Sequence, residues 1–252
     1  IDWDIVPAGV SMATGRITIN GTGAEVAVNV TADVFDSSVF PSLPDKARIF
    51  IENDGYISIL SKNFSKSVAA PDGPQWIILP NYGREMSSVK VMPTVLDAGY
   101  GGGRVPGVNS PYLEYYVYIS TPGQIDIVTQ WAPTNGMDPR QITTLQYGVA
   151  LGDEEPQIVN TLPRNFLVTN SGGIAWADGV ENAVRTMTLR DGNVCISKHN
   201  VTEPGLYPLR IYMVNDGLTL HKILVGTEKL ERVTINARNN LTDTMTGARF
   251  NL

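Results

Sequence analysis

Three adjacent carboxylates, Asp153-Glu154-Glu155, are the residues of this sequence with the most obvious capacity for chemistry. A pair of carboxylates can supply the acid and the base that hydrolyse a glycosidic bond. Adjacent side chains, however, point apart or share a solvated turn, so they do not place an acid and a base on opposite sides of one bond. The segment stands between two apolar runs, and we interpret it as a solvated turn.

Nucleophilic and metal-dependent chemistry find little support in the residue types. The sequence has no Gly-x-Ser-x-Gly nucleophile elbow. Its two histidines, His199 and His221, are too few for a three-histidine zinc site, and we expect both to be structural. The single cysteine, Cys195, excludes an internal disulfide, and its apolar neighbours Val194 and Ile196 indicate an inert buried thiol. We expect no catalytic residue, no metal site and no cofactor.

Aromatic and cationic side chains offer a second kind of chemistry, the binding of sugars. A flat ring covers the apolar face of a pyranose, and a guanidinium pairs with a carboxylate. The glycine-rich stretch 99–107 is either a loop between strands or a flap that offers Tyr100 for stacking and Arg104 for pairing. Trp131, which ends a strand, and Trp176, which has glycines on both sides, are candidate sugar platforms, although buried tryptophan is the alternative in a β-protein.

Composition excludes several classes of partner. The 252 residues are 42% hydrophobic and 17% charged, an ordinary globular balance. The net charge of -6 argues against a nucleic-acid-binding surface and against docking on anionic lipid. No apolar run approaches the roughly 20 residues that span a bilayer. We therefore expect neither nucleic acid nor a membrane among the partners.

Five Asn-x-Ser/Thr sequons favour a secreted, extracellular glycoprotein, with polar loops and strand faces that match the motif by chance as the alternative. The candidate glycosylation sites are Asn20, Asn29, Asn63, Asn200 and Asn240. The chain starts at Ile1-Asp2-Trp3-Asp4, without an initiator methionine or a leader, so we expect that it is processed or excised and that any signal peptide is gone.

The dominant period of the apolar residues is two, which predicts β-strands. Strands are expected at 16–20, 24–30, 48–52, 56–60, 75–79, 87–92, 112–120, 124–131, 141–151, 157–161, 207–214 and 218–225. The first two should form a hairpin around Asn20-Gly21, and 112–120 a second hairpin with 124–131 through Thr121-Pro122-Gly123. Only 176–189 has helical spacing. This pattern predicts an all-β fold, an antiparallel, jelly-roll-like β-sandwich.

The strand pattern divides the chain unevenly. An isolated hairpin is marginal in water, so residues 1–33 either join the main domain or end a β-module whose beginning is missing. We favour the second, because 34–47 reads as a linker. The main β-sandwich domain then covers 48–235, and 236–252 form a polar tail.

Five segments in order resemble the C-terminal domain of glycoside hydrolase family 115, the xylan α-1,2-glucuronidases. The segments are Gly55-Tyr-Ile-Ser-Ile59 with Phe64, Trp76-Ile-Ile-Leu-Pro-Asn-Tyr-Gly-Arg84, Leu113-Glu-Tyr-Tyr-Val-Tyr-Ile119, Leu151-Gly-Asp-Glu-Glu-Pro-Gln-Ile-Val-Asn160 and Tyr212-Met-Val-Asn-Asp-Gly-Leu-Thr-Leu-His-Lys-Ile223. The resemblance implies that residues 1–33 are the last strands of an immunoglobulin-like module. It also implies a parent enzyme that removes glucuronic or 4-O-methylglucuronic acid from glucuronoxylan, with its catalytic carboxylates in upstream domains.

One segment departs from the family pattern. Members usually read Ile-Glu-Ala-Glu-His-Phe where this chain has Ile59-Leu60-Ser61-Lys62-Asn63-Phe64. The family segment resembles the opening strand of calcium-binding carbohydrate-binding modules. Here Leu60 and Lys62 replace both carboxylates, and a lysine would repel Ca²⁺. We therefore expect that a calcium site is lost.

Two functions follow as hypotheses. In the first, the chain is an accessory domain of a secreted α-glucuronidase that supports the upstream catalytic domains, contributes to a homodimer or helps to hold glucuronoxylan. In the second, it is a stand-alone, lectin-like module for plant polysaccharide. Hydrolysis by this chain alone is not expected.

Overall fold

The computed structural model describes residues 12–34, 48–53, 55–83, 86–94, 103–132, 134, 145–161, 193–226 and 248–250. These residues form three β-sheets, and their one helical element is the 3-10 turn η3 (Ser61–Asn63). The part of the chain in view has no helix with the length and apolar character of a bilayer-crossing segment. The expected helix at 176–189 lies outside the described residues.

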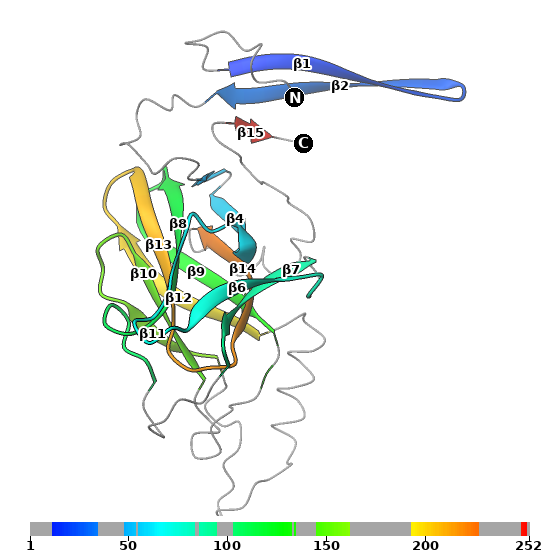
Figure 1. The fold of residues 1–252 in the computed structure, drawn as a ribbon. Coiled ribbons are helices and arrows are strands. Elements are labelled where there is room, and N and C mark those ends of the chain that lie inside the picture. Colours follow the sequence, from blue (N-terminus) through cyan, green and yellow to red (C-terminus); the bar gives the residue numbers. More distant parts are fainter. Residues whose placement is uncertain are drawn as a thin grey trace, which may run out of the picture.

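Two six-stranded sheets make up the main body of the molecule (Figure 1). The first, the β8 sheet, has the order β11 (Gln157–Asn160), β10 (Gln146–Leu151), β13 (Gly205–Met213), β8 (Tyr112–Ile119) and β3 (Ile49–Ile51), with β5 (Lys66–Val68) also paired to β8. The second, the β9 sheet, has the order β12 (Asn193–Val201), β9 (Gly123–Trp131), β14 (Thr219–Gly226), β7 (Ser87–Met92) and β6 (Gln75–Pro80), with β4 (Tyr56–Leu60) on β14. All pairings are antiparallel except that of β3 with β8, which is parallel.

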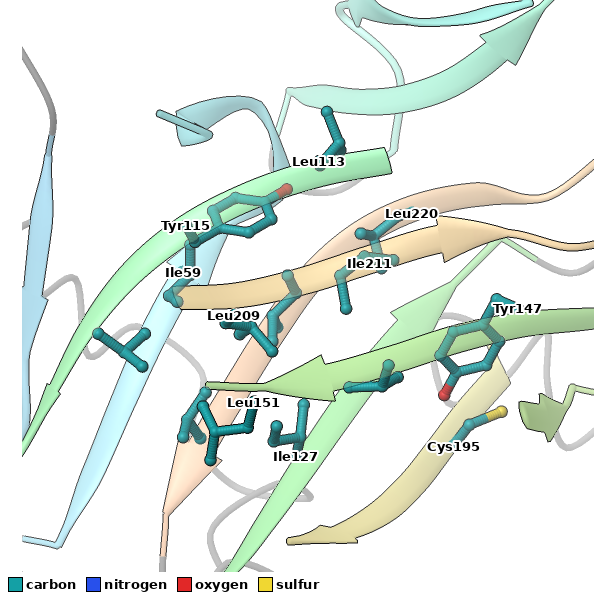
Figure 2. Packing of buried hydrophobic residues seen from close by; sticks show 14 of the residues in the cluster. Ile59, Leu113, Tyr115, Ile127, Tyr147, Leu151, Cys195, Leu209, Ile211 and Leu220 are labelled. Atoms are coloured by element: carbon teal, nitrogen blue, oxygen red, sulfur yellow. The ribbon is translucent and has the colours of Figure 1, made fainter. Parts of the chain in front are cut away.

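The two sheets pack face to face through the apolar sides of their strands, and the alternation that directs these side chains inward is clearest in β8. Leu113, Tyr115, Val117 and Ile119 of β8 are at most 1% exposed and belong to one large apolar cluster. Figure 2 shows Leu113 and Tyr115 in this layer with Leu209 and Ile211 of the neighbouring strand β13. Trp76 is also in the cluster, as its apolar sequence context suggests. The all-β sandwich expected from the sequence is therefore confirmed.

The turn after β8 does not close a hairpin, contrary to the sequence prediction. Strands β8 and β9 belong to different sheets, so the chain crosses there from one layer to the other. The buried carboxylate of Glu52 holds this corner: its Oε2 accepts hydrogen bonds from the backbone N–H of Ser120 (2.6 Å) and of Thr121 (2.9 Å). Hydrogen bonds to a carboxylate are stronger than those between neutral groups, and Glu52 accepts them although it lies 68 residues before Ser120 in the sequence.

A third sheet contains the first hairpin of the chain. Strand β1 (Met12–Gly21) pairs with β2 (Ala24–Val34), and the short β15 (Ala248–Phe250) adds to β2. The two-residue turn is Thr22-Gly23, not Asn20-Gly21 as predicted, and Gly23 supplies the positive φ of 87° that such a turn requires. Part of the predicted tail 236–252 is thus a strand.

Most of the predicted strands are present within a residue or two, but β5, β12 and β15 were missed. Strand β12 alternates, yet its buried side includes the polar Ser197 and His199. Because these inner residues are polar, the sequence of β12 lacks the alternation of apolar and polar residues from which a strand is predicted.

A matched pair of substitutions tests which face of the β9 sheet is the core. Ile127 of β9 is fully buried, whereas Ile196 of the adjacent strand β12 is 39% exposed on the outer face. We expect Ile127→Ala to lower the free energy of unfolding by about 2–5 kcal/mol, because it leaves a cavity in a packed core. Ile196→Ala should change it by less than about 0.5 kcal/mol. Urea denaturation measures both, and equal losses would contradict this assignment.

Candidate functional site

The prediction that Trp131 is a sugar platform is wrong, because its side chain is fully buried. Its indole N–H donates to Thr129 Oγ1 at 2.8 Å, and its ring packs on Tyr147 with the centroids 4.5 Å apart. The reason is the strand period: Trp131 shares the inward parity of Ile125 and Ile127 on β9. Trp176 and Tyr100 lie outside the described residues.

Arg104, the predicted partner of a sugar carboxylate, already pairs with a carboxylate of the chain itself. Its two terminal nitrogens donate to the two oxygens of Asp72, each at 2.7 Å, and Nη1 also donates to the carbonyl of Asn109 at 3.0 Å. The hydrogen bond from Arg104 lowers the pKa of the Asp72 carboxyl below its ordinary value. In this arrangement the guanidinium fork fixes the 103–109 loop, so the prediction that it selects a uronic acid is not supported.

The candidate glycosylation sites differ in accessibility. Asn20, Asn29 and Asn200 are exposed, and Asn240 lies outside the described residues. Asn63, by contrast, is only 4% exposed, and its Oδ1 accepts a hydrogen bond from Arg48 at 2.6 Å. A glycan cannot be attached to an amide that is buried and hydrogen-bonded in this way, so the prediction for Asn63 is wrong.

The Asp153-Glu154-Glu155 segment is a turn whose outer two side chains are exposed, as predicted. Glu154 has a further role, because its Oε2 lies 2.6 Å from His199 Nδ1 on β12 of the other sheet. The neighbouring Gln157 donates from Nε2 to the carbonyl of Lys198 at 2.6 Å. These contacts join the edge strands β11 and β12 and close that side of the sandwich.

Two serine–histidine contacts were missed by sequence reasoning. His199 also lies 2.9 Å from Ser197 Oγ through Nε2, so Ser197, His199 and Glu154 have the order of a nucleophile, a base and an acid. Likewise, Ser88 Oγ lies 2.6 Å from His221 Nδ1. The Ser-x-His spacing on one strand was the available signal for the first. All four Ser and His residues are less than 9% exposed, and a nucleophile must touch its substrate, so both contacts are structural.

Cys195 is inert, as predicted. It lies beside Tyr147 in the core (Figure 2). Burial raises the pKa of its thiol to about 12, which keeps the sulfur protonated and non-nucleophilic at physiological pH.

The residues at the calcium site implied by the family resemblance do not fit a calcium ion. Lys62 is exposed in η3, and Leu60 offers no oxygen from its side chain. The nearby polar groups are already used, since Ser61 Oγ donates to the carbonyl of Leu220 at 2.8 Å and Asn63 accepts from Arg48. Among the described residues there is also no group of three or more His, Cys, Asp or Glu side chains that could hold a metal ion.

The most distinctive surface is the outer side of the β8 sheet, where the strand period places a row of tyrosines. We call it the tyrosine face and define it by Tyr112, Glu114 and Tyr116 of β8 and by Arg210 and Tyr212 of β13. The register sets Tyr112 opposite Tyr212 and Glu114 opposite Arg210, so these side chains share one side of the sheet. Tyr112 and Tyr212 are in contact, with ring centroids 5.1 Å apart.

A hydrogen-bonded network fixes the middle of the tyrosine face. Glu114 Oε2 accepts from Arg210 Nε at 2.7 Å, and Glu114 Oε1 accepts from the Tyr116 hydroxyl at 3.0 Å. Burial is the largest single effect on Arg210 and disfavours its charged form, but the hydrogen bond to Glu114, the Glu114 charge and the neighbouring tyrosines together raise the pKa of the guanidinium. Burial and the adjacent Glu114 also raise the pKa of Tyr116, so the phenol stays protonated. The face therefore presents rigid aromatic rings and a permanent cation.

The fold and the site together define a class of protein: a two-sheet β-sandwich domain with a closed apolar core and an aromatic outer face. Residues 49–235 match the model of the glycosyl hydrolase family 115 C-terminal domain. Since the match covers most of the chain, the chain belongs to this family, as its sequence resemblance suggests.

Comparison with solved structures gives similar folds at low sequence identity. A family GH115 4-O-methyl-α-glucuronidase with specificity for decorated arabinogalactans is 12% identical with a TM-score of 0.47, over 73% of this chain and 19% of that enzyme. The C-terminal family 6 carbohydrate-binding module of a Zobellia galactanivorans laminarinase is 14% identical (TM-score 0.39; 68% of this chain and 98% of that one). A family 35 carbohydrate-binding module from Clostridium thermocellum is 9% identical (TM-score 0.37; 68% and 96%). No curated protein matched the chain.

The Glu114–Arg210 pair can be tested by a double-mutant cycle. The side chain of Glu114 is 7% exposed, so Arg210→Met leaves a nearly buried carboxylate with only the Tyr116 hydroxyl as its partner. We expect a loss of about 2–3 kcal/mol in the free energy of unfolding. Glu114→Gln should recover part of that loss in the double variant, because it removes the unpaired charge. Additive single and double losses in urea denaturation would contradict the coupling.

Proposed function

We propose that this chain is the accessory, non-catalytic end of a secreted xylan α-1,2-glucuronidase. The whole enzyme would hydrolyse glucuronic or 4-O-methylglucuronic acid side chains from glucuronoxylan. Here the chain would support the upstream catalytic domains, contribute to oligomer contacts and help to hold the polysaccharide. Its family membership supports this role.

The observation that carries the proposal is an uncovered apolar face on the β1–β2 hairpin. Ile17 pairs with Val28 and Ile19 with Val26, so these four side chains lie on one side of the hairpin. They are 52%, 39%, 57% and 56% exposed, respectively. The opposite side has polar pairs such as Arg16 with Asn29. A contiguous exposed apolar surface of this kind marks a site of contact with another protein segment.

The carboxylates of the sandwich support a non-catalytic role. Among the described residues, the buried acids Glu52, Glu114 and Asp126 each bond to a group of the chain itself. A glycosidase acid and base must instead face each other across the sugar. These buried carboxylates hold strands and corners together.

A matched pair of double variants tests the apolar face as the contact with the rest of the enzyme. Upon co-expression with the upstream part of its own polypeptide, we expect the unaltered chain to co-elute with it in size exclusion at micromolar concentration. Ile17→Lys with Val28→Lys should abolish co-elution, because two charges would have to be buried. Thr18→Lys with Ala27→Lys, an exposed pair on the opposite side of the same hairpin, should leave it intact.

Two results would overturn the proposal. One is separate elution of the unaltered chain from the upstream part. The other is release of glucuronic acid from glucuronoxylan by the purified 252-residue chain, since that would make the chain itself catalytic.

Secretion is a part of the proposal that the sequons support. The register places Asn20 and Asn29 on the polar side of the hairpin, away from Ile17 and Val28. Glycans at these two positions would leave the apolar face free for its partner. The intact mass of the natural protein would detect them.

A further inference from the structure

The tyrosine face is a separate surface from the apolar face of the β1–β2 hairpin, and the proposed contact with the upstream domains does not use it. An exposed lysine lies beside it. Lys66 of the edge strand β5 pairs in register with Glu114, so its side chain belongs to the same side of the β8 sheet as Tyr112 and Tyr116. Lys66 is exposed, and Tyr112 and Tyr116 are half-buried. Their rings are therefore reachable from solvent while their positions are fixed by the strand.

The accessible charge on this face is positive although the whole chain is acidic. The side chain of Arg210 is 28% exposed, whereas that of its partner Glu114 is only 7% exposed. Lys66 forms no ion pair with any described residue. Exposed carboxylates flank the strands of this face in the sequence: Asp72, which is paired with Arg104, follows β5, and Glu203 precedes β13. An occupant of this face therefore meets cations and phenols first, in a protein with a net charge of -6.

The shape of the face favours a linear occupant. Tyr112 and Tyr116 are four residues apart on strand β8, which separates their Cα atoms by about 13 Å at the usual rise of a β-strand. Between them lies the Glu114–Arg210 pair, and Pro106 packs against Gly148 next to Tyr212 at one end. Rings spaced along a strand suit a chain of pyranoses, whose faces are apolar.

We propose that the tyrosine face, together with Lys66, binds a linear polysaccharide that carries uronic acid groups. Tyr112 and Tyr116 stack on sugar rings, and the exposed Lys66 attracts the uronate carboxylate. Arg210 is bonded to Glu114 and to the carbonyl of Gly152, so it contributes its positive charge. This inference deepens the proposed function, because it names the ligand class and the surface through which an accessory domain would hold it. Arg104, which the sequence suggested for the carboxylate, is engaged by Asp72 instead.

Isothermal titration calorimetry of the 252-residue chain tests the proposal. The two ligands are xylo-oligosaccharides of equal backbone length, one with a 4-O-methylglucuronic acid branch and one unsubstituted. We expect the branched ligand to bind at least about tenfold more tightly, and this preference to shrink in 0.5 M salt, which screens exposed charges. Equal binding of the two ligands, or binding of neither at millimolar concentration, would overturn the proposal.

Three variants locate the site. Tyr116→Ala should weaken both ligands by about tenfold, because it removes a stacking ring. Lys66→Glu should weaken only the branched ligand, since it reverses an exposed charge without touching the rings. Tyr82→Ala, a 46% exposed tyrosine beside the β9 sheet on the β6–β7 turn, is the matched control and should bind like the unaltered chain. The site is refuted if Lys66→Glu and Tyr116→Ala both bind normally while their thermal unfolding is unchanged.

The alternative is that this face binds a protein surface instead of a sugar. Sugar binding measured in the presence of the upstream domains distinguishes the two. If the upstream part of the polypeptide blocks binding of the branched ligand, the tyrosine face is an interface within the enzyme and the proposal fails. Persistence of binding in the co-eluting complex supports it. Failure of sugar binding leaves the co-elution result intact, so this inference and the proposed function fail separately.

Discussion

The two-residue period of strand β8 is the constraint on which the rest of the molecule depends. Leu113, Tyr115, Val117 and Ile119 must face the β9 sheet, because they fill the apolar layer between the two sheets. A slip of one residue would place Glu114 in that layer and expose all four. The core therefore decides which tyrosines face solvent, and the neighbouring strand β13 brings Arg210 and Tyr212 to the same side. The outer face is a consequence of how the inner face packs.

Charged groups in this sandwich act mainly as structural ties. Glu52 fixes the corner where the chain crosses between sheets, and Glu154 links the open edge through His199. Glu114 organises the outer face through Arg210 and Tyr116. Glu52 and Glu114 are buried and would be costly to desolvate without their partners, so these two make the local geometry specific. The same groups that could have suggested catalysis are thus committed to the scaffold.

Alternation in the sequence was sufficient to predict the fold class and most of the strands, and the apolar neighbours of Cys195 indicated its burial. It failed where distant residues decide the outcome. The crossing after β8 depends on Glu52, and the burial of Asn63 depends on Arg48; neither partner can be read from the local pattern. Trp131 is a different case, because its inward parity with Ile127 was visible, but its position before a proline suggested a strand end at the surface. Pairing of β12 with β9, which buries Ser197 and His199, likewise required the sheet order.

The most direct test of the account is a backbone amide chemical-shift titration of the chain with the uronic-acid-branched xylo-oligosaccharide, because it maps the contact surface without any substitution. The account predicts that the largest shifts fall on β5, β8 and β13, around Lys66, Tyr116 and Arg210, with the β6–β7 turn at Tyr82 unchanged. Shifts confined to the β9 sheet or to the loop around Arg104, with β8 and β13 unperturbed, would contradict it.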